Sequence, residues 1–361
     1  MIEFENVSKH YGSTVALDDV SFTVPDGTVS VLIGPSGCGK STSLKLVNRL
    51  LEPTDGYVRV DGTPVREFPP QILRRGIGYV IQSVGLLPHM TVEENIGLVP
   101  KLLGRHKRDR SRRAGELLDL IGLSPDEYRN KYPIQLSGGE AQRVGVARAL
   151  AADPPILLMD EPFGAVDPLN RETLQQEFIS IQRKLRKTVI FVTHDLDEAV
   201  RVADRIVLMR DGKVVQTGAP EEILGAPAND FVREFVGSDR ALKRLARFIV
   251  GDFMIDAPSV DRGARLDWNE YRDFEVVYVT DDHRRLLGAA PRNGRAEVSS
   301  AGDAMDDALV GAVSLGSTLR DALAEILNTE LAETPVVDEH GHLVGRITMT
   351  EIYSATPRRI V

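Results

Sequence analysis

Nine consecutive residues near the N-terminus have the types and the order needed to bind a nucleoside triphosphate. They follow the pattern G-x-x-x-x-G-K-[ST] and are Gly34, Pro35, Ser36, Gly37, Cys38, Gly39, Lys40, Ser41 and Thr42. The glycines let backbone N–H groups turn toward a β-phosphate at the start of a helix, whose dipole favours anions. Lys40 supplies a positive charge to the β- and γ-phosphates, and the Ser41 hydroxyl is a ligand for Mg²⁺. We expect Cys38, the only cysteine, to be a spectator side chain.

An acidic pair ends a short apolar run farther along the chain. Residues 156–159 are Ile-Leu-Leu-Met, and Asp160 and Glu161 follow them. A carboxylate in the position of Asp160 can hold Mg²⁺ through its water shell. The neighbouring Glu161 can polarise the attacking water as a general base. Another division of labour between the two carboxylates stays open at this point.

Short apolar runs alternate with helical patterns over the first 240 residues, which predicts a mainly parallel sheet flanked by helices. The predicted strands are Val29–Ile33, Ile156–Met159, Val189–Thr193, Arg205–Met209 and Lys213–Thr217. The last two flank Asp211-Gly212, a strong signal for a hairpin turn. Ser41–Leu51 reads as the helix that follows the glycine-rich loop.

Residues of about 84–150 read as an inserted, mostly helical subdomain with glycine and proline breaks. A basic run lies near its middle and consists of Arg105, Lys107, Arg108, Arg110, Arg112 and Arg113. Both a nucleic-acid patch and a solvated helix face fit such a run. The formal net charge of -9 favours the solvated face, and we expect no nucleic-acid partner.

The bulk properties are those of a soluble, globular, cytosolic chain. Its 361 residues are enough for two or three domains. No stretch approaches the roughly 18–20 apolar residues that span a bilayer. The N-terminal residues 1–12 carry charges where a signal peptide needs an apolar core. If the chain serves a membrane, we expect it to do so through a partner.

The sequence pattern changes after residue 240. In this part of the chain, two segments align without gaps at an offset of 57 residues. Residues 279–288 and 336–345 share Asp281/Asp338, His283/His340, Leu286/Leu343 and Gly288/Gly345. Both segments read as strand, turn and strand, and the second follows a helical pattern at Ser317–Leu327. We interpret them as a tandem module, with chance similarity of two hairpins as the alternative.

The segment Leu136-Ser-Gly-Gly-Glu140 indicates which class of nucleotide-binding protein contains this glycine-rich loop. Here the chain resembles the ATP-binding cassette (ABC) family, whose signature is LSGGQ-like, although Glu140 stands where glutamine is commonest. The resemblance covers residues 1 to about 240 and implies that Ser137, Gly138 and Gly139 bind ATP. It also implies an ATP hydrolase of the α/β class, with a β-subdomain and a helical subdomain.

Four further positions match family motifs in order. The resemblance implies that Tyr11 stacks on adenine and that Gln82 contacts Mg²⁺ and the attacking water while sensing a permease. Asp167 matches the acidic residue of the D-loop, with Val166 where leucine is usual. His194 matches the switch histidine, which would hydrogen-bond the γ-phosphate.

The family implies a head-to-tail homodimer that encloses two ATP molecules. Each site would join the glycine-rich loop of one copy to Ser137 and the following glycines of the other. Ser137 would cap a helix whose N-terminal amides face the γ-phosphate. The resemblance further implies membrane permease subunits as partners, an extracytoplasmic solute-binding protein as an indirect partner, and a place at the cytoplasmic face of the membrane.

Residues 82–103 resemble the importers of glycine betaine, choline, carnitine and proline, and the tandem resembles the paired cystathionine-β-synthase (CBS) domains of that branch. Thr348 and Glu351 resemble a ribose-binding pattern for an adenine nucleotide, with Glu where Asp is usual. The first copy has Pro291 and Gly294 at these positions, so the pair has at most one such site. A purely structural dimerisation tail is the alternative.

We expect a boundary at residues 240/241, with a linker helix and the tandem in 241–361. Three other functions remain open from sequence. They are an importer ATPase for a different small polar solute, a non-transport ABC ATPase, and a nucleotide-sensing protein with the cassette as scaffold. Intact Lys40, Glu161 and His194 argue against an inactive scaffold. The chain does not specify the solute, because the permease and binding protein select it.

Overall fold

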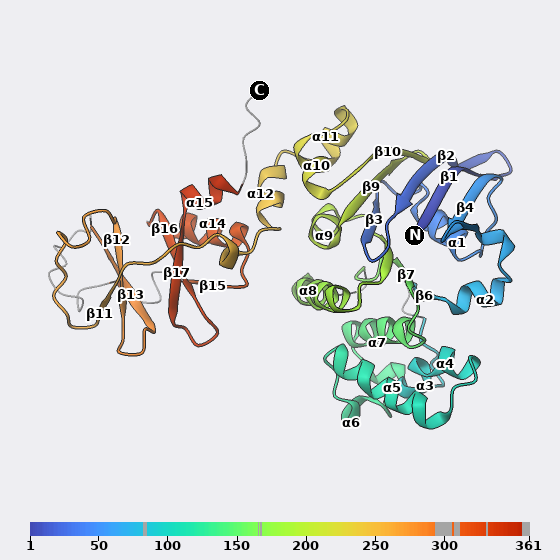
Figure 1. Cartoon of the computed structure of the whole chain (residues 1–361), viewed down its shortest axis with the longest axis horizontal. Coiled ribbons are helices and arrows are strands. Elements are labelled where there is room, and N and C mark those ends of the chain that lie inside the picture. The colour runs from blue at the N-terminus through green and yellow to red at the C-terminus, as the bar shows by residue number, and fades with distance from the viewer. Residues whose placement is uncertain are drawn as a thin grey trace. The chain divides into compact units, whose positions relative to one another are not determined.

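Figure 1 shows a computed structural model of the chain, which describes residues 1–81, 85–164, 166, 168–292, 305–306, 311–329 and 331–355. It divides into two compact units, Met1–Val236 and Gly237–Val361. The division lies four residues before the boundary expected from sequence. Each unit is described by itself.

A six-stranded sheet forms the centre of the first unit, in the order β10-β9-β3-β8-β7-β6. Its strands are β3 (Val29–Ile33), β6 (Ile77–Val80), β7 (Ile156–Asp160), β8 (Thr188–Val192), β9 (Arg205–Arg210) and β10 (Lys213–Gly218). All neighbours are parallel except β9 and β10. Every residue of β3, β7 and β8 is buried, which explains why these strands are mostly apolar.

Side chains alternate between the two faces of this sheet and so build two separate cores. Leu157 and Met159 of β7 join the core beneath the helical layer, whereas Ile156 and Leu158 join the core on the opposite face. That opposite core is covered by an antiparallel sheet in the order β2-β1-β4-β5. Its strands are β1 (Ile2–Tyr11), β2 (Thr14–Val24), β4 (Asp55–Val60) and β5 (Thr63–Pro64).

The helices of the first unit fall on both sides of the six-stranded sheet. They are α1 (Lys40–Val47), α2 (Pro70–Arg75), α3 (Val92–Ile96), α4 (Leu98–Leu102), α5 (Lys107–Leu120), α6 (Pro125–Tyr128), α7 (Gly138–Leu150), α8 (Pro168–Leu185), α9 (Leu196–Val202), α10 (Pro220–Gly225) and α11 (Asp230–Val236). Short 3₁₀ turns occupy Val65–Glu67 and Pro133–Gln135. Helix α1 contributes to the core shared with the antiparallel sheet, while α5, α7 and α8 contribute to the other core.

Two local predictions can be compared directly with the structure. The Asp211-Gly212 hairpin is confirmed, with φ of 50° and 79° at its two turn residues. The helix expected over Ser41–Leu51 ends at Val47, because Asn48 caps it and Arg49 takes a φ of 49°. A left-handed residue cannot continue an α-helix.

The second unit contains two small sheets, β11-β12-β13-β14 and β15-β16-β17. Its strands are β11 (Ser259–Asp261), β12 (Val276–Thr280), β13 (Leu286–Pro291), β14 (Met305–Asp306), β15 (Val313–Ser314), β16 (Glu333–Val337) and β17 (Leu343–Thr348). Its helices are α12 (Arg240–Leu245), α14 (Leu319–Asn328) and α15 (Met349–Ser354), and a 3₁₀ turn lies at Val250–Asp252.

The 57-residue repeat is visible in the strand pairing of this unit. The pairs of β12 with β13, from Val276↔Pro291 to Thr280↔Leu286, recur 57 residues later in β16 with β17, including the irregularity at the last pair. The two turns bond to each other reciprocally, Leu286 N to Gly341 O at 3.1 Å and Leu343 N to Arg284 O at 2.9 Å. The copies differ before the hairpin, since α14 precedes β16 whereas residues 262–275 contain no helix.

None of the described helices combines the length and the apolar character needed to cross a membrane.

Candidate functional site

The loop Gly34–Thr42 connects β3 to α1 and requires glycine at two of its positions. Gly34 has a φ of 151°, and a Cβ there would lie 2.0 Å from the Met209 carbonyl oxygen. Gly39 has a φ of 104°, and a Cβ there would lie 2.4 Å from a methyl carbon of Leu17. The loop therefore passes so close to β2 and β9 that only glycine fits.

Lys40 is the first residue of α1, and its side chain folds back over the loop. Its Nζ donates to the carbonyl oxygens of Gly34, at 2.7 Å, and Pro35, at 3.0 Å, and the residue is only 7% exposed. Gly39, at the N-cap of α1, has no side chain to accept a hydrogen bond from the first helical turn. A buried positive charge and an uncapped helix N-terminus thus meet at one place, which suits a phosphate group.

Ser41 and Asp160 meet next to this loop. The Ser41 hydroxyl donates to Asp160 Oδ1 at 3.0 Å. Asp160 is the last residue of β7, and Ser41 comes after the loop that leaves the carboxyl end of β3. The carboxyl ends of parallel strands share one edge of a sheet. Burial raises the pKa of the Asp160 carboxyl above its usual value, although the hydrogen bond from Ser41 opposes the shift. A cation beside Asp160 would reverse the shift.

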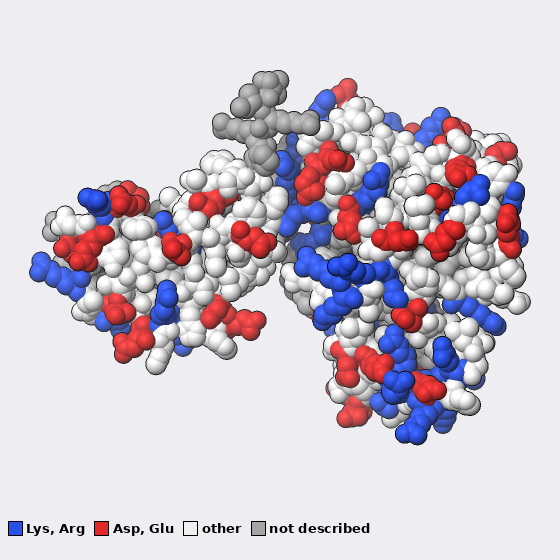
Figure 2. All heavy atoms as spheres, viewed as in Figure 1, with Lys and Arg blue, Asp and Glu red and all other residues white. Residues whose placement is uncertain are grey.

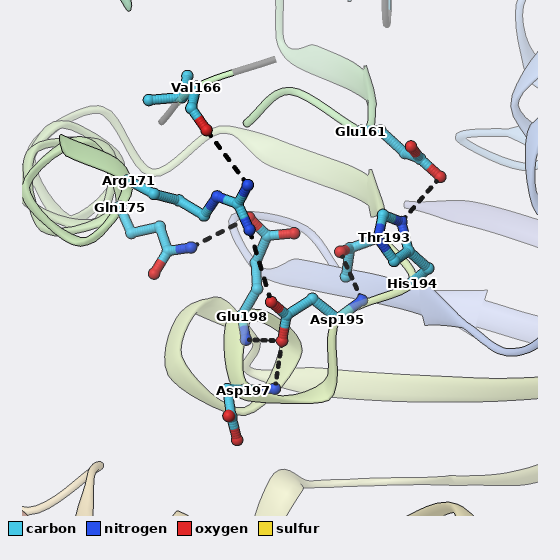
Figure 3. Close-up of polar contacts among 9 residues, drawn as sticks. All are labelled: Glu161, Val166, Arg171, Gln175, Thr193, His194, Asp195, Asp197 and Glu198. Carbon is cyan, nitrogen blue, oxygen red and sulfur yellow. Dashed lines mark hydrogen bonds and ion pairs between the residues drawn. The ribbon is translucent and has the colours of Figure 1, made fainter. Parts of the chain in front are cut away.

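Glu161 lies directly beyond β7 with a φ of 46°, which is unusual for a residue other than glycine. Its backbone N–H donates to Val192 O at 2.9 Å, so the turn is tied to the neighbouring strand β8. Its Oε1 lies 3.2 Å from His194 Nδ1, as Figure 3 shows. The side chain of Glu161 is 23% exposed and that of His194 is 64% exposed. The pair can therefore reach a ligand from the solvent side.

A polar network holds the segment that carries His194 (Figure 3). Thr193 Oγ1 accepts from Asp195 N at 3.0 Å, and Asp195 Oδ1 caps α9 by accepting from two backbone amides. Arg171 lies 3.9 Å from Asp195 Oδ2 and donates to Val166 O at 3.2 Å. Our sequence reasoning missed this network. The N-cap pattern that starts at Asp195 was the available signal for part of it.

Burial raises the pKa of the Glu198 carboxyl on α9, against the hydrogen bonds from Thr193 and Gln175. Gln175 Nε2, on α8, donates to Glu198 Oε1 at 3.1 Å. Figure 3 shows the side chain of Glu198 directed toward Gln175. Glu198 thus connects α9 to α8 in the network next to the histidine segment.

The segment Ser137–Gly139 starts α7 with a capping box. Ser137 Oγ accepts from Glu140 N at 3.3 Å, and Glu140 Oε2 accepts from Ser137 N at 2.7 Å. The Tyr128 hydroxyl donates to Glu140 Oε1 at 2.6 Å and lowers the pKa of that carboxyl, with the Ser137 backbone adding to the effect. Glutamate can replace the commoner glutamine here because the cap needs only an acceptor oxygen.

The residues expected to bind the phosphates of ATP thus fall into two groups, one at the start of α1 and one at the start of α7. Helix α1 packs in the core on one face of the six-stranded sheet, and α7 packs in the core on the other. Tyr11 lies at the end of β1 and is 46% exposed, with Lys9 Nζ 5.2 Å from its ring centroid. Gln82 and Asp167 lie outside the described residues.

Thr348 and Glu351 of the second unit lie together at the start of α15. They form a capping box in which Glu351 Oε2 accepts from the Thr348 backbone N–H at 3.1 Å and from the Thr348 hydroxyl. Their polar atoms therefore stabilise a helix of six residues. Of the two equivalents in the first copy, Pro291 ends β13 and Gly294 is outside the described residues.

The donor set beside the loop suits a hard cation. A hydroxyl and a carboxylate oxygen converge from Ser41 and Asp160, and Mg²⁺ binds through one or two protein oxygens plus phosphate oxygens and water. Within the described ranges, no group of three or more His, Cys, Asp and Glu side chains could hold a metal by itself.

A glycine-rich loop before an uncapped helix, an acidic strand end and a histidine at the next strand define a P-loop ATPase cassette. Residues 17–164 match the family model described as ABC transporter, and residues 301–357 match the model described as CBS domain.

The osmoprotectant import ATP-binding protein OsmV of Salmonella typhimurium is 42% identical, over 98% of this chain and 95% of that protein. The glycine betaine/carnitine/choline transport ATP-binding protein OpuCA of Bacillus subtilis is 43% identical over the same shares. The dimeric structure of MJ0796, a bacterial ABC transporter cassette, is 37% identical with a TM-score of 0.56, covering 61% of this chain and 98% of that one. The chain belongs to the family of ABC transporter ATP-binding subunits, which bind and hydrolyse ATP to power transport.

Proposed function

We propose that this chain energises the import of a quaternary-amine osmoprotectant such as glycine betaine, choline or carnitine, or of the related solute proline. The observation that carries the proposal is the full-length similarity to OsmV and OpuCA, whose names state such transport and which match both the cassette and the tail. A cassette alone is shared by transporters of many solutes. Similarity that extends through the second unit favours this branch.

In this proposal the loop Gly34–Thr42 binds the phosphates of ATP. The buried Nζ of Lys40 exchanges its bonds to the loop carbonyls for bonds to the β- and γ-phosphates. The amides at the start of α1 complete the cradle. Tyr11, half-exposed at the end of β1, offers its ring to the adenine.

Ser41, Asp160 and Gln82 would hold Mg²⁺, and their oxygen donors suit that ion. When bound, the ion neutralises charge on the β- and γ-phosphates. The Ser41 hydroxyl already points its hydrogen at Asp160, so the pair keeps both oxygens at the edge of the sheet where the phosphates lie. Asp160 is 9% exposed, and burial raises the pKa of its carboxyl, so a cation beside it would stabilise the carboxylate.

Glu161 would accept a proton from the attacking water as a general base. Its contact with His194 Nδ1 at 3.2 Å orients the carboxylate, and the network of Thr193, Asp195 and Arg171 holds the histidine segment in place. His194 would then donate to the γ-phosphate and stabilise charge that develops on it. Asp167 is assigned to the D-loop by its match to the family motif.

Each ATP would lie between two copies of this chain. The separation of α1 and α7 on opposite faces of the sheet supports a second copy as the source of Ser137, Gly138 and Gly139. The dimeric structure of the MJ0796 cassette supports the pairing of two copies. Hydrolysis would remove the γ-phosphate that joins the two copies, and the dimer would open.

The remaining partners follow from the transport function. Integral membrane permease subunits would dock on the cassettes at the cytoplasmic face of the membrane, and an extracytoplasmic binding protein would deliver the solute. The second unit is proposed as a regulatory CBS pair. An adenine nucleotide remains its proposed ligand at Thr348 and Glu351, and binding there has to open the capping box that now joins them.

Replacement of the proposed base separates ATP binding from hydrolysis. We expect Glu161→Gln to keep ATP affinity within about threefold, to lower kcat at least about a hundredfold, and to accumulate as an ATP-bound dimer. Nucleotide binding, phosphate release and size-exclusion chromatography measure these three quantities. Turnover at the wild-type rate would refute the assignment of Glu161.

Uptake experiments test the solute class. Cells that express this chain with its cognate permease and binding protein are supplied with labelled glycine betaine, choline, carnitine or proline. We expect uptake of at least one of them, abolished by Glu161→Gln. ATP-dependent uptake of only an unrelated solute would refute the osmoprotectant assignment while leaving the ATPase assignment intact.

A further inference from the structure

A cavity of about 350 Å³ lies in the helical layer of the first unit, away from the loop Gly34–Thr42. The segment after α4, the first turns of α5 and residues 151–153 after α7 surround it. Its lining includes four arginines and two aspartates, namely Arg105, Arg110, Arg112, Arg113, Asp109 and Asp153. Figure 2 shows lysine and arginine side chains gathered over the region where Figure 1 places α4 and α5.

The acidic side chains around this cavity are too few to neutralise its arginines. Arg112 and Arg113 share one carboxylate, that of Glu116, at 2.8 Å and 3.4 Å. Asp153 is already engaged by Lys187 at 2.7 Å. Arg105 and Arg110 form no ion pair with any residue that the structure describes. Asp109 adds one further carboxylate, but the four arginines still outnumber the acidic groups that remain for them. The cavity therefore carries a net positive charge at a partly enclosed place, where screening by solvent is weaker than on an open surface.

Arg110 gives a second, independent observation. Its Nε is buried and has no hydrogen-bond partner among the described residues. Several arginines share this property, but Arg110 is the one that lines the cavity. A buried donor without an acceptor is costly, and an anion bound beside Arg110 whose oxygen reaches Nε would remove that cost. The basic run is thus more than an evenly solvated helix face, because part of it lines a hollow.

We propose that this cavity binds a phosphate-bearing anion through Arg105 and Arg110. Guanidinium groups bind phosphate through paired hydrogen bonds, and a phosphate offers enough oxygens to engage two arginines at once. The volume lies at the lower end of the range for small-molecule sites, which suits a phosphate group with a small substituent. A lipid headgroup and a soluble phosphate share this chemistry. The proposal does not depend on the transported solute.

The test uses the full chain carrying Lys40→Ala, which weakens phosphate binding at the loop. One arm measures binding of pyrophosphate by calorimetry. The other measures co-sedimentation with phosphatidylcholine vesicles that do or do not contain phosphatidylglycerol. Arg110→Glu is compared with Arg108→Glu, the same charge reversal at an exposed position in the first turn of α5 that does not line the cavity. Thermal unfolding of every variant checks that it folds.

We expect Arg110→Glu to weaken binding at least about tenfold in one arm while Arg108→Glu changes it less than about twofold. Loss confined to the pyrophosphate arm identifies a soluble phosphate, and loss confined to anionic vesicles identifies a lipid headgroup. Equal losses for both variants would show diffuse electrostatic attraction and overturn the proposal. Absence of binding in both arms by the folded Lys40→Ala protein would overturn it as well. Arg105→Ala serves as a second variant if Arg110→Glu does not fold.

Discussion

The two helices that start at the proposed ATP site, α1 and α7, begin in opposite ways. Helix α1 starts after Gly39, which offers no side chain to its first turn, and the nearest charge is the buried Nζ of Lys40. Helix α7 starts with a complete capping box formed by Ser137 and Glu140. The first N-terminus is left to be completed by a ligand, whereas the second is already stable without one.

This difference fits two separate roles in the proposed composite ATP site, one for each helix. A helix end that lacks a cap gains most from an anion, so α1 is suited to capture ATP. A helix end that is already capped presents a fixed surface, so α7 is suited to close over a nucleotide held elsewhere. Separate mutations should therefore impair the capture of ATP by α1 and the closure of α7 over the nucleotide.

The largest effect is expected from Gly39→Ala, which disrupts capture. The Cβ would meet Leu17 at 2.4 Å and Ala16 O at 2.8 Å in a backbone with φ of 104°. Strain and overpacking each cost about 1–3 kcal/mol, so ATP binding should weaken at least about thirtyfold. Titration with a fluorescent ATP analogue measures this effect.

Gly37→Ala is the matched control, because Gly37 also has a positive φ, of 81°, but has open space around its Cβ. It should lower ATP affinity less than about tenfold. Equal losses for the two variants would show that backbone strain alone, rather than close packing against β2, decides the shape of the loop.

Ser137→Ala is expected to disrupt closure without disrupting capture. ATP binding to the monomer should stay within about twofold, while turnover should fall about tenfold or more, because the hydroxyl is lost and the neighbouring amides remain. The lost cap should also cost about 1 kcal/mol of stability. Steady-state hydrolysis and urea unfolding measure the two quantities.

Thr91→Ala removes the same kind of cap from α3 in the same unit. It should reproduce the loss of stability while changing turnover less than about twofold. If both variants lose turnover equally, Ser137 acts only through the stability of its helix.

Asp160→Asn is expected to stabilise the empty protein by up to about 1 kcal/mol at pH 7 while abolishing Mg²⁺-dependent hydrolysis. Burial raises the pKa of Asp160 in the folded state, so the unfolded state loses its proton first as pH rises. The wild type therefore loses stability as pH rises through the window between the two pKa values, and the advantage of the variant should shrink toward pH 4. Urea unfolding across this range, with the exposed Asp55→Asn as control, measures the trend.

Glu140→Gln should have the smallest effect, within about 0.5 kcal/mol of stability at pH 7, because the amide oxygen keeps the capping box. The hydrogen bond from Tyr128 lowers the pKa of Glu140, so its contribution is present above the unfolded pKa and disappears as pH falls through the folded pKa. The two proteins should thus converge in acid. A loss above about 1 kcal/mol at pH 7 would mean that the charge, rather than the cap, holds α7.

Local patterns predicted much of this architecture because they reflect local forces. The limits of β3 were predicted correctly, since a buried parallel strand is mostly apolar, and Ser30 is the one polar residue of this strand. The 57-residue offset predicted two matching hairpins, and the structure confirms the match residue by residue. The missing helix in residues 262–275 was not predicted, since the similarity between the copies is confined to the hairpins.

The sequence by itself determined the chemistry of the first unit, because the glycine-rich loop, the acidic strand end and the Ser137 cap are each set by neighbours in the chain. Tertiary structure alone decided which of these groups meet. Pairing of parallel strands brings Ser41 to Asp160 and Glu161 to His194, across separations of 119 and 33 residues. The alternation of side chains across the sheet places α1 and α7 in cores on opposite faces, which is the basis for proposing that a second copy completes each ATP site.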